Sequence, residues 1–506
     1  MKRYGTLAGI AFAVLVFASV WLGALNQDEG WYLYAARLVA EGKVMYRDFF
    51  YTQGPLLPLV YSAFCGAWED AGLVGGRIVT ASIGLLALVF AAALARFLAP
   101  AGRKGAAGTI AFMLLGCNLY HVYYTSIPKT YALASFFLLI GFYLLAFSLR
   151  MLPPAYPEKL KNAFVFFAGL TMALSAGARV SLILAVAVVA TGLFAVRKTE
   201  KMSFAWFAGG AFAGLMSVYG FVLFDSKTFH GLLAAMSYHG ARGGFDPIFT
   251  IGSASRLVRW YAPLFVLLGM VFFRKRQRLA PESDMLARSR FPLNMMACSF
   301  LAVFALQMFA PYPYEDYQVP VMPLLAVYVA VKIVSIASLS LSRVVLLTLG
   351  MTWALSFGSP LLEKWTVNGQ DRFWALKKEK TELAQLQDIA RLIEAIDPGG
   401  KKLFTQDIYL AIETNRKVPK GLEMGPFSML SHDEWVDLLE NTDCNVAALS
   451  GYTFAVNPPV CTERPIEEQM EYWSILKRRY RLFMKENAFG QHATPLLVLT
   501  KKGFEQ

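Results

Sequence analysis

Long apolar runs separated by short polar segments fill the first 358 residues of the chain. The runs at about 73–97, 130–149 and 203–224 are long enough to cross the hydrocarbon core of a bilayer as helices. About eleven segments of this kind can be distinguished, which predicts a polytopic α-helical membrane domain over residues 1–358. The predicted spans cover residues 6–25, 73–97, 106–124, 130–149, 162–178, 180–196, 203–224, 256–273, 291–310, 319–337 and 343–358.

The loop between the first two spans has a different pattern. Residues 28–40 place Trp31, Tyr34 and Leu38 on one helical face, which is typical of a helix lying along the membrane interface. Asn26 and Glu29 have the spacing of a capping box, so this helix is expected to begin there. After a turn, a second apolar helix is predicted at about 55–68, and it is short for a crossing. The first outer loop is therefore predicted to hold two interfacial helices.

From residue 359 to residue 506 the composition is that of a soluble domain. Helices are predicted at 371–396, 407–414, 432–440 and 464–486, and strands at 402–405, 445–449 and 495–500. This pattern indicates a small α/β domain, and it contains no phosphate loop, no metal-type Cys/His spacing and no nucleophile elbow. Cys444 and Cys461 of this domain either form a disulfide, if the domain is extracytoplasmic, or remain free.

Composition supports the membrane assignment, because 56% of residues are hydrophobic and only 16% are charged. The net charge of +13 arises from short basic clusters between apolar runs, most clearly at 274–290. Such clusters follow the positive-inside rule and indicate topology rather than a nucleic-acid partner. The rule places the N-terminus inside as a retained first helix, and the odd number of spans then places the C-terminal domain outside.

Two adjacent acids, Asp28 and Glu29, follow the first span directly. Charge at the border of lipid and water is costly, so both are candidate catalytic residues. A structural alternative exists, because acids in a first helical turn complement the helix dipole by about 0.3–1 kcal/mol each. The capping box already gives Glu29 such a role, whereas Asp28 is the stronger candidate for catalysis.

Three cations lie at the predicted outer ends of spans or in outer loops, namely Lys129, Arg179 and Arg242. Each either extends toward lipid head groups or binds a lipid-linked phosphate, and the guanidinium fork of Arg179 suits phosphate best. Arg242 shares a predicted polar loop, 225–255, with His230 and His239. Two histidines on a loop are a weak metal signal, so no metal site is predicted.

Polar and aromatic side chains of the outer loops are candidates for contact with a sugar. Asp48, Tyr51 and Gln53 belong to the turn between the interfacial helices, and Tyr317 precedes the tenth span. An ion pair between Arg47 and Asp48 and an aromatic belt are the structural alternatives.

These features together resemble the GT-C superfamily of membrane glycosyltransferases. The resemblance rests on the Asp28-Glu29 pair, the two interfacial helices, the Tyr46-Arg47-Asp48 turn with its later Gly54-Pro55-Leu56, and the outer α/β domain. It is greatest to the polyprenyl-phosphate-sugar-dependent branch that includes bacterial protein mannosyltransferases and lipid A aminoarabinose transferases. In layout it covers residues 1–358, with its specific motif at 28–55 and weaker similarity at 177–179 and 317–323.

The resemblance implies a bacterial inner-membrane enzyme that uses a polyprenyl-phosphate sugar, with Asp28 as base and a glycan, lipid or protein as acceptor. No cofactor is expected, and a divalent metal ion is an alternative that the sequence does not support. One departure is that many relatives carry an acid at the turn between the third and fourth spans, where this chain has Ile127-Pro128-Lys129. That turn therefore supplies neither a second carboxylate nor a ligand for a metal.

Inverting sugar transfer is the function favoured by the sequence. Asp28 would take the proton of the acceptor hydroxyl, and cations would stabilise the phosphate leaving group. A lipid-linked-sugar transporter or flippase is disfavoured, because several spans are nearly free of charge in their middle. A non-catalytic glycolipid-binding assembly protein on the same scaffold remains an alternative.

Overall fold

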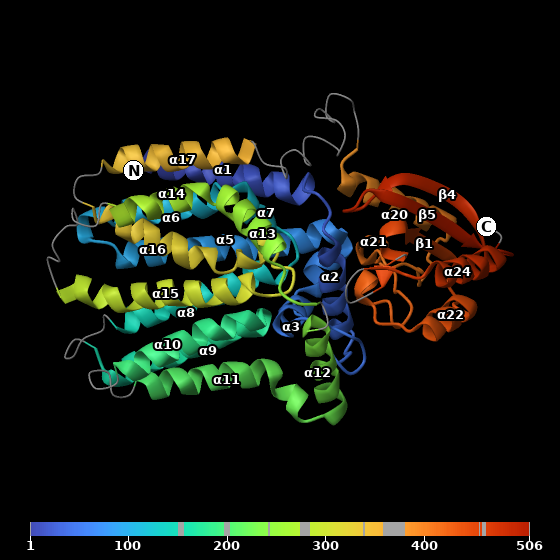
Figure 1. Ribbon diagram of the computed structural model, residues 1–506, viewed down its shortest axis with the longest axis horizontal. Coiled ribbons are helices and arrows are strands. Elements are labelled where there is room, and N and C mark those ends of the chain that lie inside the picture. The colour runs from blue at the N-terminus through green and yellow to red at the C-terminus, as the bar shows by residue number, and fades with distance from the viewer. Residues whose placement is uncertain are drawn as a thin grey trace.

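The protein consists of a helical bundle and a C-terminal α/β domain that packs against one end of it (Figure 1). The helices of the bundle run roughly parallel to one another, and α2 (Gln27–Ala40) lies across their end, between the bundle and the C-terminal domain. The computed structural model describes residues 2–149, 156–196, 203–240, 243–273, 284–336, 340–357, 380–454, 456–457 and 462–504.

Among the described residues, six helices are long and apolar enough to cross a membrane, and two bent pairs raise this number to as many as eight. Three shorter apolar helices complete the set of predicted spans. The long helices are α1 (Lys2–Trp21), α5 (Gly72–Leu98), α8 (Thr130–Ser148), α9 (Glu158–Ala178), α11 (Ser203–Leu223) and α15 (Asp284–Met308). The bent pairs are α6 (Lys104–Gly116) with α7 (Leu119–Ser126) and α13 (Pro247–Trp260) with α14 (Ala262–Phe273), and the shorter helices are α10 (Ile183–Ala195), α16 (Met322–Val334) and α17 (Leu341–Phe357).

The prediction of a polar loop at 225–255 is wrong. The segment contains α12 (Ser226–Gly240) and the first part of α13. Asp225 accepts a hydrogen bond from the Lys227 amide, and Asp246 accepts two from the first turn of α13. These aspartates cap the two helices, and Pro247 occupies the first turn of α13, where proline is favoured. The pair α13–α14 bends by 85° and α6–α7 by 72°, so the predicted spans 256–273 and 106–124 are not straight helices.

The first outer loop begins with α2, as the capping box predicts. The Asn26 side chain accepts from the Asp28 amide, and Glu29 accepts from the Asn26 amide. The second predicted helix is broken into α3 (Leu56–Ser62) and α4 (Cys65–Trp68). α2 is buried on nearly all sides, and its Arg37 forms an ion pair with Glu69 at 2.7 Å. This packing holds α2 between the bundle and the C-terminal domain.

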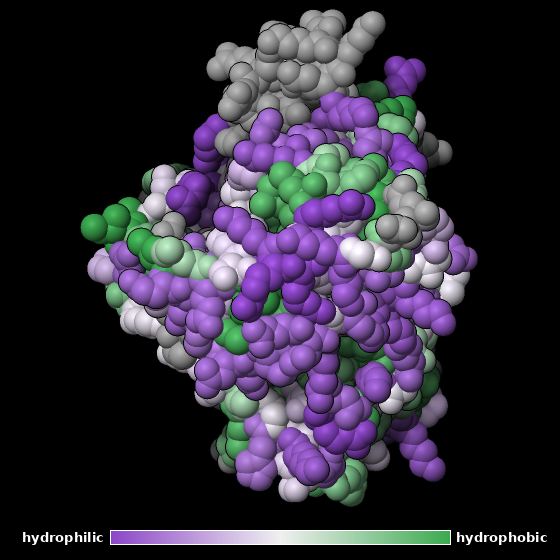
Figure 2. Space-filling model, turned by 90° about the vertical axis from the view of Figure 1, so that its right-hand side faces the viewer, coloured by the Kyte–Doolittle hydropathy of each residue, from purple (hydrophilic) through white to green (hydrophobic). Residues whose placement is uncertain are grey.

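The C-terminal domain is α/β, as predicted. An antiparallel sheet in the order β1-β5-β4 packs with α20 (Glu382–Ile396), α21 (Ile408–Glu413), α22 (His432–Asn441) and α24 (Ile466–Arg479). Its strands are β1 (Val446–Ser450), β4 (Tyr480–Phe489) and β5 (Thr494–Lys501), and β2 (Val456–Asn457) pairs separately with β3 (Thr462–Glu463). The face of the molecule that this domain forms is mostly hydrophilic (Figure 2).

Two predictions for this domain are wrong. Residues 480–486 were expected to continue a helix, but they pair with β5 as strand β4, because sheet pairing with a distant strand overrides the local helical pattern. Residues 402–405 form only isolated bridges, one of them between Phe404 and Ala447, and no strand. The first part of the predicted helix 371–396 lies outside the described residues. Cys444 is a buried free thiol, and Cys461 also lies outside the described residues.

Close contact between α2 and α21 joins the two domains. A Cβ on Gly30 would lie 2.2 Å from the Tyr409 amide nitrogen, so only glycine permits this approach. The Val418 amide donates to the Tyr34 hydroxyl at 3.0 Å, and the Leu25 amide donates to Glu382 Oε2 at 2.7 Å. These contacts fix α2, and with it Asp28, relative to both domains.

Candidate active site

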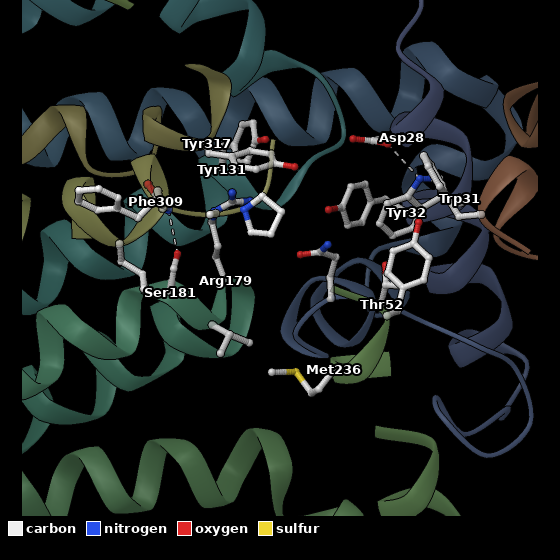
Figure 3. Close-up of a pocket in the computed structure, with 18 residues that line it drawn as sticks. Asp28, Trp31, Tyr32, Thr52, Tyr131, Arg179, Ser181, Met236, Phe309 and Tyr317 are labelled. Atoms are coloured by element: carbon white, nitrogen blue, oxygen red, sulfur yellow. Dashed lines mark hydrogen bonds between the residues drawn. The ribbon is translucent and has the colours of Figure 1, made fainter. Parts of the chain in front are cut away.

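A cavity of about 470 Å³ opens where the first outer loop meets the ends of α9 and α15. Asp28, Trp31 and Tyr32 of α2 face Arg179, Tyr131 and Tyr317 across it (Figure 3). Thr52 and Gln53 complete the polar part of the wall, and Phe427 is contributed by the C-terminal domain. Met236, Leu306 and Phe309 form a partly exposed apolar side.

Asp28 lies in the first turn of α2, with its side chain 27% exposed. The Trp31 indole donates to its Oδ1 at 3.2 Å, and Lys129 Nζ lies 2.9 Å from its Oδ2. A carboxylate has about four lone-pair sites, so these two contacts fix its orientation and leave sites free to accept a proton.

Lys129 directly precedes α8 and lies between two carboxylates. Its Nζ is 3.0 Å from Asp316 Oδ2, which also accepts a hydrogen bond from the Tyr131 hydroxyl at 2.8 Å. Burial by itself lowers the pKa of Lys129, but the attraction of Asp28 and Asp316 outweighs it and holds the pKa well above its usual value. Lys129 therefore carries its charge at physiological pH, and both carboxylates neutralise it.

Arg179 occupies the break between α9 and the short helix Val180–Leu182. Its guanidinium lies over the rings of Tyr131, at 5.0 Å, and Tyr317, at 4.7 Å. Among the described residues no ion pair involves Arg179, and its buried Nε has no hydrogen-bond partner. An arginine held by aromatic rings, with donors free to enter a cavity, is suited to a phosphate or carboxylate ligand.

Two glycines bring the Arg179 segment close to the first outer loop. A Cβ on Gly54 would lie 2.2 Å from the Gly177 carbonyl oxygen, so the turn before α3 packs directly on the end of α9. The Tyr46 hydroxyl donates to the Gln53 carbonyl at 2.6 Å and holds the same turn. The end of the specific motif, at 54–55, and the weaker similarity at 177–179 therefore meet in space.

Glu29 does not reach the cavity. Its carboxylate is fully buried, and Arg77 Nε and Nη2 donate to its two oxygens at 2.7 and 2.8 Å. Arg77 also donates to carbonyls at the end of α1, including those of Gly23 and Ala24. Glu29 therefore joins α1, α2 and α5, and its catalytic role, predicted as one of two alternatives, has no geometric support.

The remaining predicted residues are divided between several places. Gln53 and Tyr317 line the cavity, whereas Tyr51 is fully buried behind its wall, against the rings of Trp31 and Tyr32. Asp48 lies elsewhere, where a hydrogen bond from the Arg47 guanidinium, and then one from the Val44 amide, lower its pKa. Arg242 lies outside the described residues.

Asp316 is the main site residue that the sequence did not single out individually. It belongs to the short helix Glu315–Gln318, in which only Tyr317 was named as a candidate from the sequence. The neighbouring Glu315 accepts from Ser253 at 3.2 Å and pairs with Arg256 at 3.0 Å, which anchors this helix to α13. Contact between residues 129 and 316 depends on helix packing, so no local pattern predicts it.

The described residues contain no group of three or more His, Cys, Asp or Glu side chains suited to hold a metal ion. Asp28 lines the cavity, and Lys129 lies between it and Asp316. The Lys129 ammonium occupies the space between these two carboxylates, so the residues around the cavity do not fit a divalent ion at that position.

Comparison with known proteins identifies the fold. No protein-family model matches the sequence, and no curated protein matches it. The structure resembles ArnT from Cupriavidus metallidurans in the apo state, with a TM-score of 0.62, 15% sequence identity and 98% of each chain covered. The same ArnT bound to undecaprenyl phosphate gives a TM-score of 0.62 at 13% identity, covering 100% of this chain and 99% of that chain.

The oligosaccharyltransferase of Archaeoglobus fulgidus in the apo form gives a TM-score of 0.53 at 10% identity, covering 98% of this chain and 75% of that chain. These proteins are members of the GT-C superfamily. The chain has the GT-C fold. The predicted polytopic architecture with a C-terminal α/β domain is confirmed. At these identities the similarity concerns the GT-C fold, and the assignment of chemistry depends on the cavity.

Proposed function

We propose that the protein is an inverting glycosyltransferase that moves a sugar from a polyprenyl-phosphate donor to a hydroxyl group of an acceptor. The observation that carries this proposal is the arrangement of Asp28 and Arg179, which face one another across a single cavity (Figure 3). A carboxylate on one side and an arginine on the other match the two demands of the reaction, proton removal and stabilisation of a phosphate.

The reaction would proceed as a single displacement. Asp28 takes the proton of the acceptor hydroxyl while the acceptor oxygen forms a bond to the anomeric carbon of the sugar. The bond between the anomeric carbon and the phosphate oxygen breaks, and its electron pair leaves with the polyprenyl phosphate. Attack opposite the leaving group inverts the configuration. Because phosphate is already a stable anion, it needs cationic donors rather than a general acid.

Arg179 is the donor-phosphate residue of this proposal. Its guanidinium enters the cavity and has no carboxylate partner among the described residues, whereas Lys129 is already neutralised by two carboxylates. We therefore assign Lys129 to the orientation of Asp28 rather than to the phosphate. Gln53 and Tyr317 would contact the sugar, and a phosphate role for Arg242 stays a prediction.

The apolar side of the cavity would admit the polyprenyl chain. Leu306 and Phe309 at the end of α15, with Met236 of α12, are 45–68% exposed. Such a surface beside a polar cavity suits a lipid whose head group reacts. ArnT, an aminoarabinose transferase with the same fold, has been solved with undecaprenyl phosphate bound, which supports a polyprenyl phosphate as the donor lipid here.

The proposed location is a bacterial inner membrane, with the N-terminus cytoplasmic and the C-terminal domain on the outer face. The acceptor, a glycan, lipid or protein, would enter beside Phe427, where the C-terminal domain borders the cavity. The basic cluster at 274–290, which the positive-inside rule assigns to the inner face, is the sequence evidence for this orientation.

Proteoliposomes test the reaction class. Purified protein is reconstituted with a radiolabelled polyprenyl-phosphate hexose or pentose, and envelope extract from a strain without the protein supplies the acceptor. If the protein transfers the sugar, the label is expected to move to a new product and polyprenyl phosphate to be released. Movement of intact labelled lipid across the bilayer, without product, would instead indicate a transporter. Donor binding without either event would indicate an assembly protein.

A further inference from the structure

The Lys129 ammonium bridges two carboxylates, Asp28 and Asp316, that lie far apart in the sequence of the membrane domain. Its Nζ lies 2.9 Å from Asp28 Oδ2 and 3.0 Å from Asp316 Oδ2. The Lys129 side chain is only 7% exposed, and the rings of Tyr124 and Tyr131 lie 5.4 and 5.1 Å from Nζ. Two carboxylates and two aromatic rings thus hold the Lys129 ammonium in place.

Two carboxylates that both lie within 3.0 Å of one atom repel one another unless a cation or a shared proton lies between them. Oxygen ligands from two acids, together with water or substrate, are what a divalent ion such as Mg²⁺ or Mn²⁺ commonly uses. Here a side chain of the protein occupies that position. An ammonium is a compact point charge, and its burial is tolerated because both acids compensate the lost hydration.

We propose that Lys129 is a built-in cation that takes the place of a divalent ion between Asp28 and Asp316. This inference rests on the proposed transferase function. It has two consequences, namely that sugar transfer proceeds without a divalent ion and that Asp316 is a positioning residue that acts through Lys129.

The anchoring of Asp316 explains how it would position Asp28. The Tyr131 hydroxyl donates to Asp316 Oδ2 at 2.8 Å, and the adjacent Glu315 is tied to Arg256 of α13. A fixed Asp316 holds Lys129 Nζ, and Nζ holds Asp28 Oδ2, while Trp31 holds Oδ1. The free lone pairs of Asp28 are thereby directed toward the cavity that Asp28 lines.

Manganese binding tests the inference without reference to activity. Mn²⁺ is titrated into the purified full-length protein and measured by electron paramagnetic resonance. Lys129→Ala removes the ammonium and leaves space between the acids, so it is expected to gain one Mn²⁺ site that wild type lacks. Lys129→Met removes the charge but fills the space, and is expected to gain none. The double variant Lys129→Ala with Asp316→Asn should lose the gained site. This loss would show that Mn²⁺ binds between Asp28 and Asp316 and not at acids on the surface.

Transfer assays test the two consequences. Wild-type activity is expected to be unchanged by EDTA and by added Mn²⁺. Asp316→Asn is expected to lower kcat about 10–100-fold, the effect typical of a residue that orients a reacting group, with the KM for the donor unchanged. Lys129→Arg, which keeps a cation between the acids, should retain more activity than Lys129→Met.

Several results would overturn the inference. Loss of wild-type activity in EDTA with recovery in Mn²⁺ would do so, and so would a Mn²⁺ site in wild type that Asp316→Asn removes. A folded Lys129→Ala protein that gains no Mn²⁺ site would show that the ammonium does not occupy a cation position. These results leave the proposed function intact, whereas absence of transfer by wild type under all conditions would contradict the function and leave the Mn²⁺ result valid.

Discussion

Glu29 and Arg77 form a completely buried, bidentate ion pair, with Nε and Nη2 donating at 2.7 and 2.8 Å. Arg77 also binds carbonyls at the end of α1, including Val20 and Ala24. The pair therefore connects three helices directly behind the catalytic carboxylate proposed here. Removal of one partner from a buried pair leaves an uncompensated charge, which costs far more than loss of an exposed pair.

Glu29→Ala is accordingly expected to lower the free energy of unfolding by about 3–5 kcal/mol. Thermal unfolding in detergent measures the effect, with Asp70→Asn, an exposed acid of the same loop, as the control. A Glu29→Ala protein with normal thermal stability but no transfer activity would contradict the structural role and restore Glu29 as a catalytic candidate.

Gly30→Ala is expected to weaken the attachment of the C-terminal domain. Its Cβ would lie 2.2 Å from the Tyr409 amide nitrogen, so α2 and α21 would have to separate. Limited proteolysis should release the C-terminal domain faster than in wild type. Gly9→Ala is a suitable control, because its Cβ would meet nothing within 4 Å. Equal proteolysis rates for Gly30→Ala and Gly9→Ala would show that the α2–α21 contact does not hold the domain.

Arg179→Gln tests the phosphate assignment. Hydrogen bonds to charged groups contribute about 1.5–3 kcal/mol, so the variant should bind the donor or its transition state roughly 10–100-fold more weakly. Arg179→Lys should also be impaired, since lysine provides neither the planar fork nor the same stacking on Tyr131 and Tyr317. Binding of polyprenyl phosphate and kcat/KM are the measurements.

Arg343→Gln, at an exposed site on α17, is the control. Unchanged donor affinity in Arg179→Gln would contradict the assignment.

The pH dependence of activity should contain no contribution from Lys129 near neutrality. The two carboxylates hold its pKa well above the usual value, despite burial. Lys129 is therefore fully charged below about pH 10. It loses its proton, and with it the positive charge, only as the pH rises through the higher folded-state pKa. Transfer rates measured between about pH 7 and 9.5 should show no loss of a proton from Lys129. A fall in this interval that disappears in Lys129→Arg would contradict the bridge.

The sequence allowed much of this arrangement to be predicted, for identifiable reasons. Apolar length predicted the spans, and the Asn26–Glu29 spacing predicted the start of α2, because both signals are local. Arg179, Gln53 and Tyr317 line one cavity, because outer loop ends converge on one side of a bundle. Asp28 lies there too, at the first turn of α2.

Contacts between distant segments account for what was missed. The Lys129–Asp316 bridge and the Glu29–Arg77 pair each join segments that only helix packing brings together. Strand β4 has a local helical pattern that its pairing with β5 overrides. Asp225 and Asp246 cap α12 and α13, and such capping residues are a local signal for helices in the segment predicted as a loop.

Transfer by Asp28→Asn, measured beside wild type in the same proteoliposomes, tests the central claim most directly. The substitution keeps the size of the side chain and removes the base, so transfer should fall about 10²–10⁴-fold. Binding of polyprenyl phosphate should remain close to that of wild type, because Arg179 and the apolar side of the cavity are untouched. The protein should stay folded, because Asp316 still pairs with Lys129. Transfer by a folded Asp28→Asn protein at the wild-type rate would contradict the assignment of Asp28 as the catalytic base.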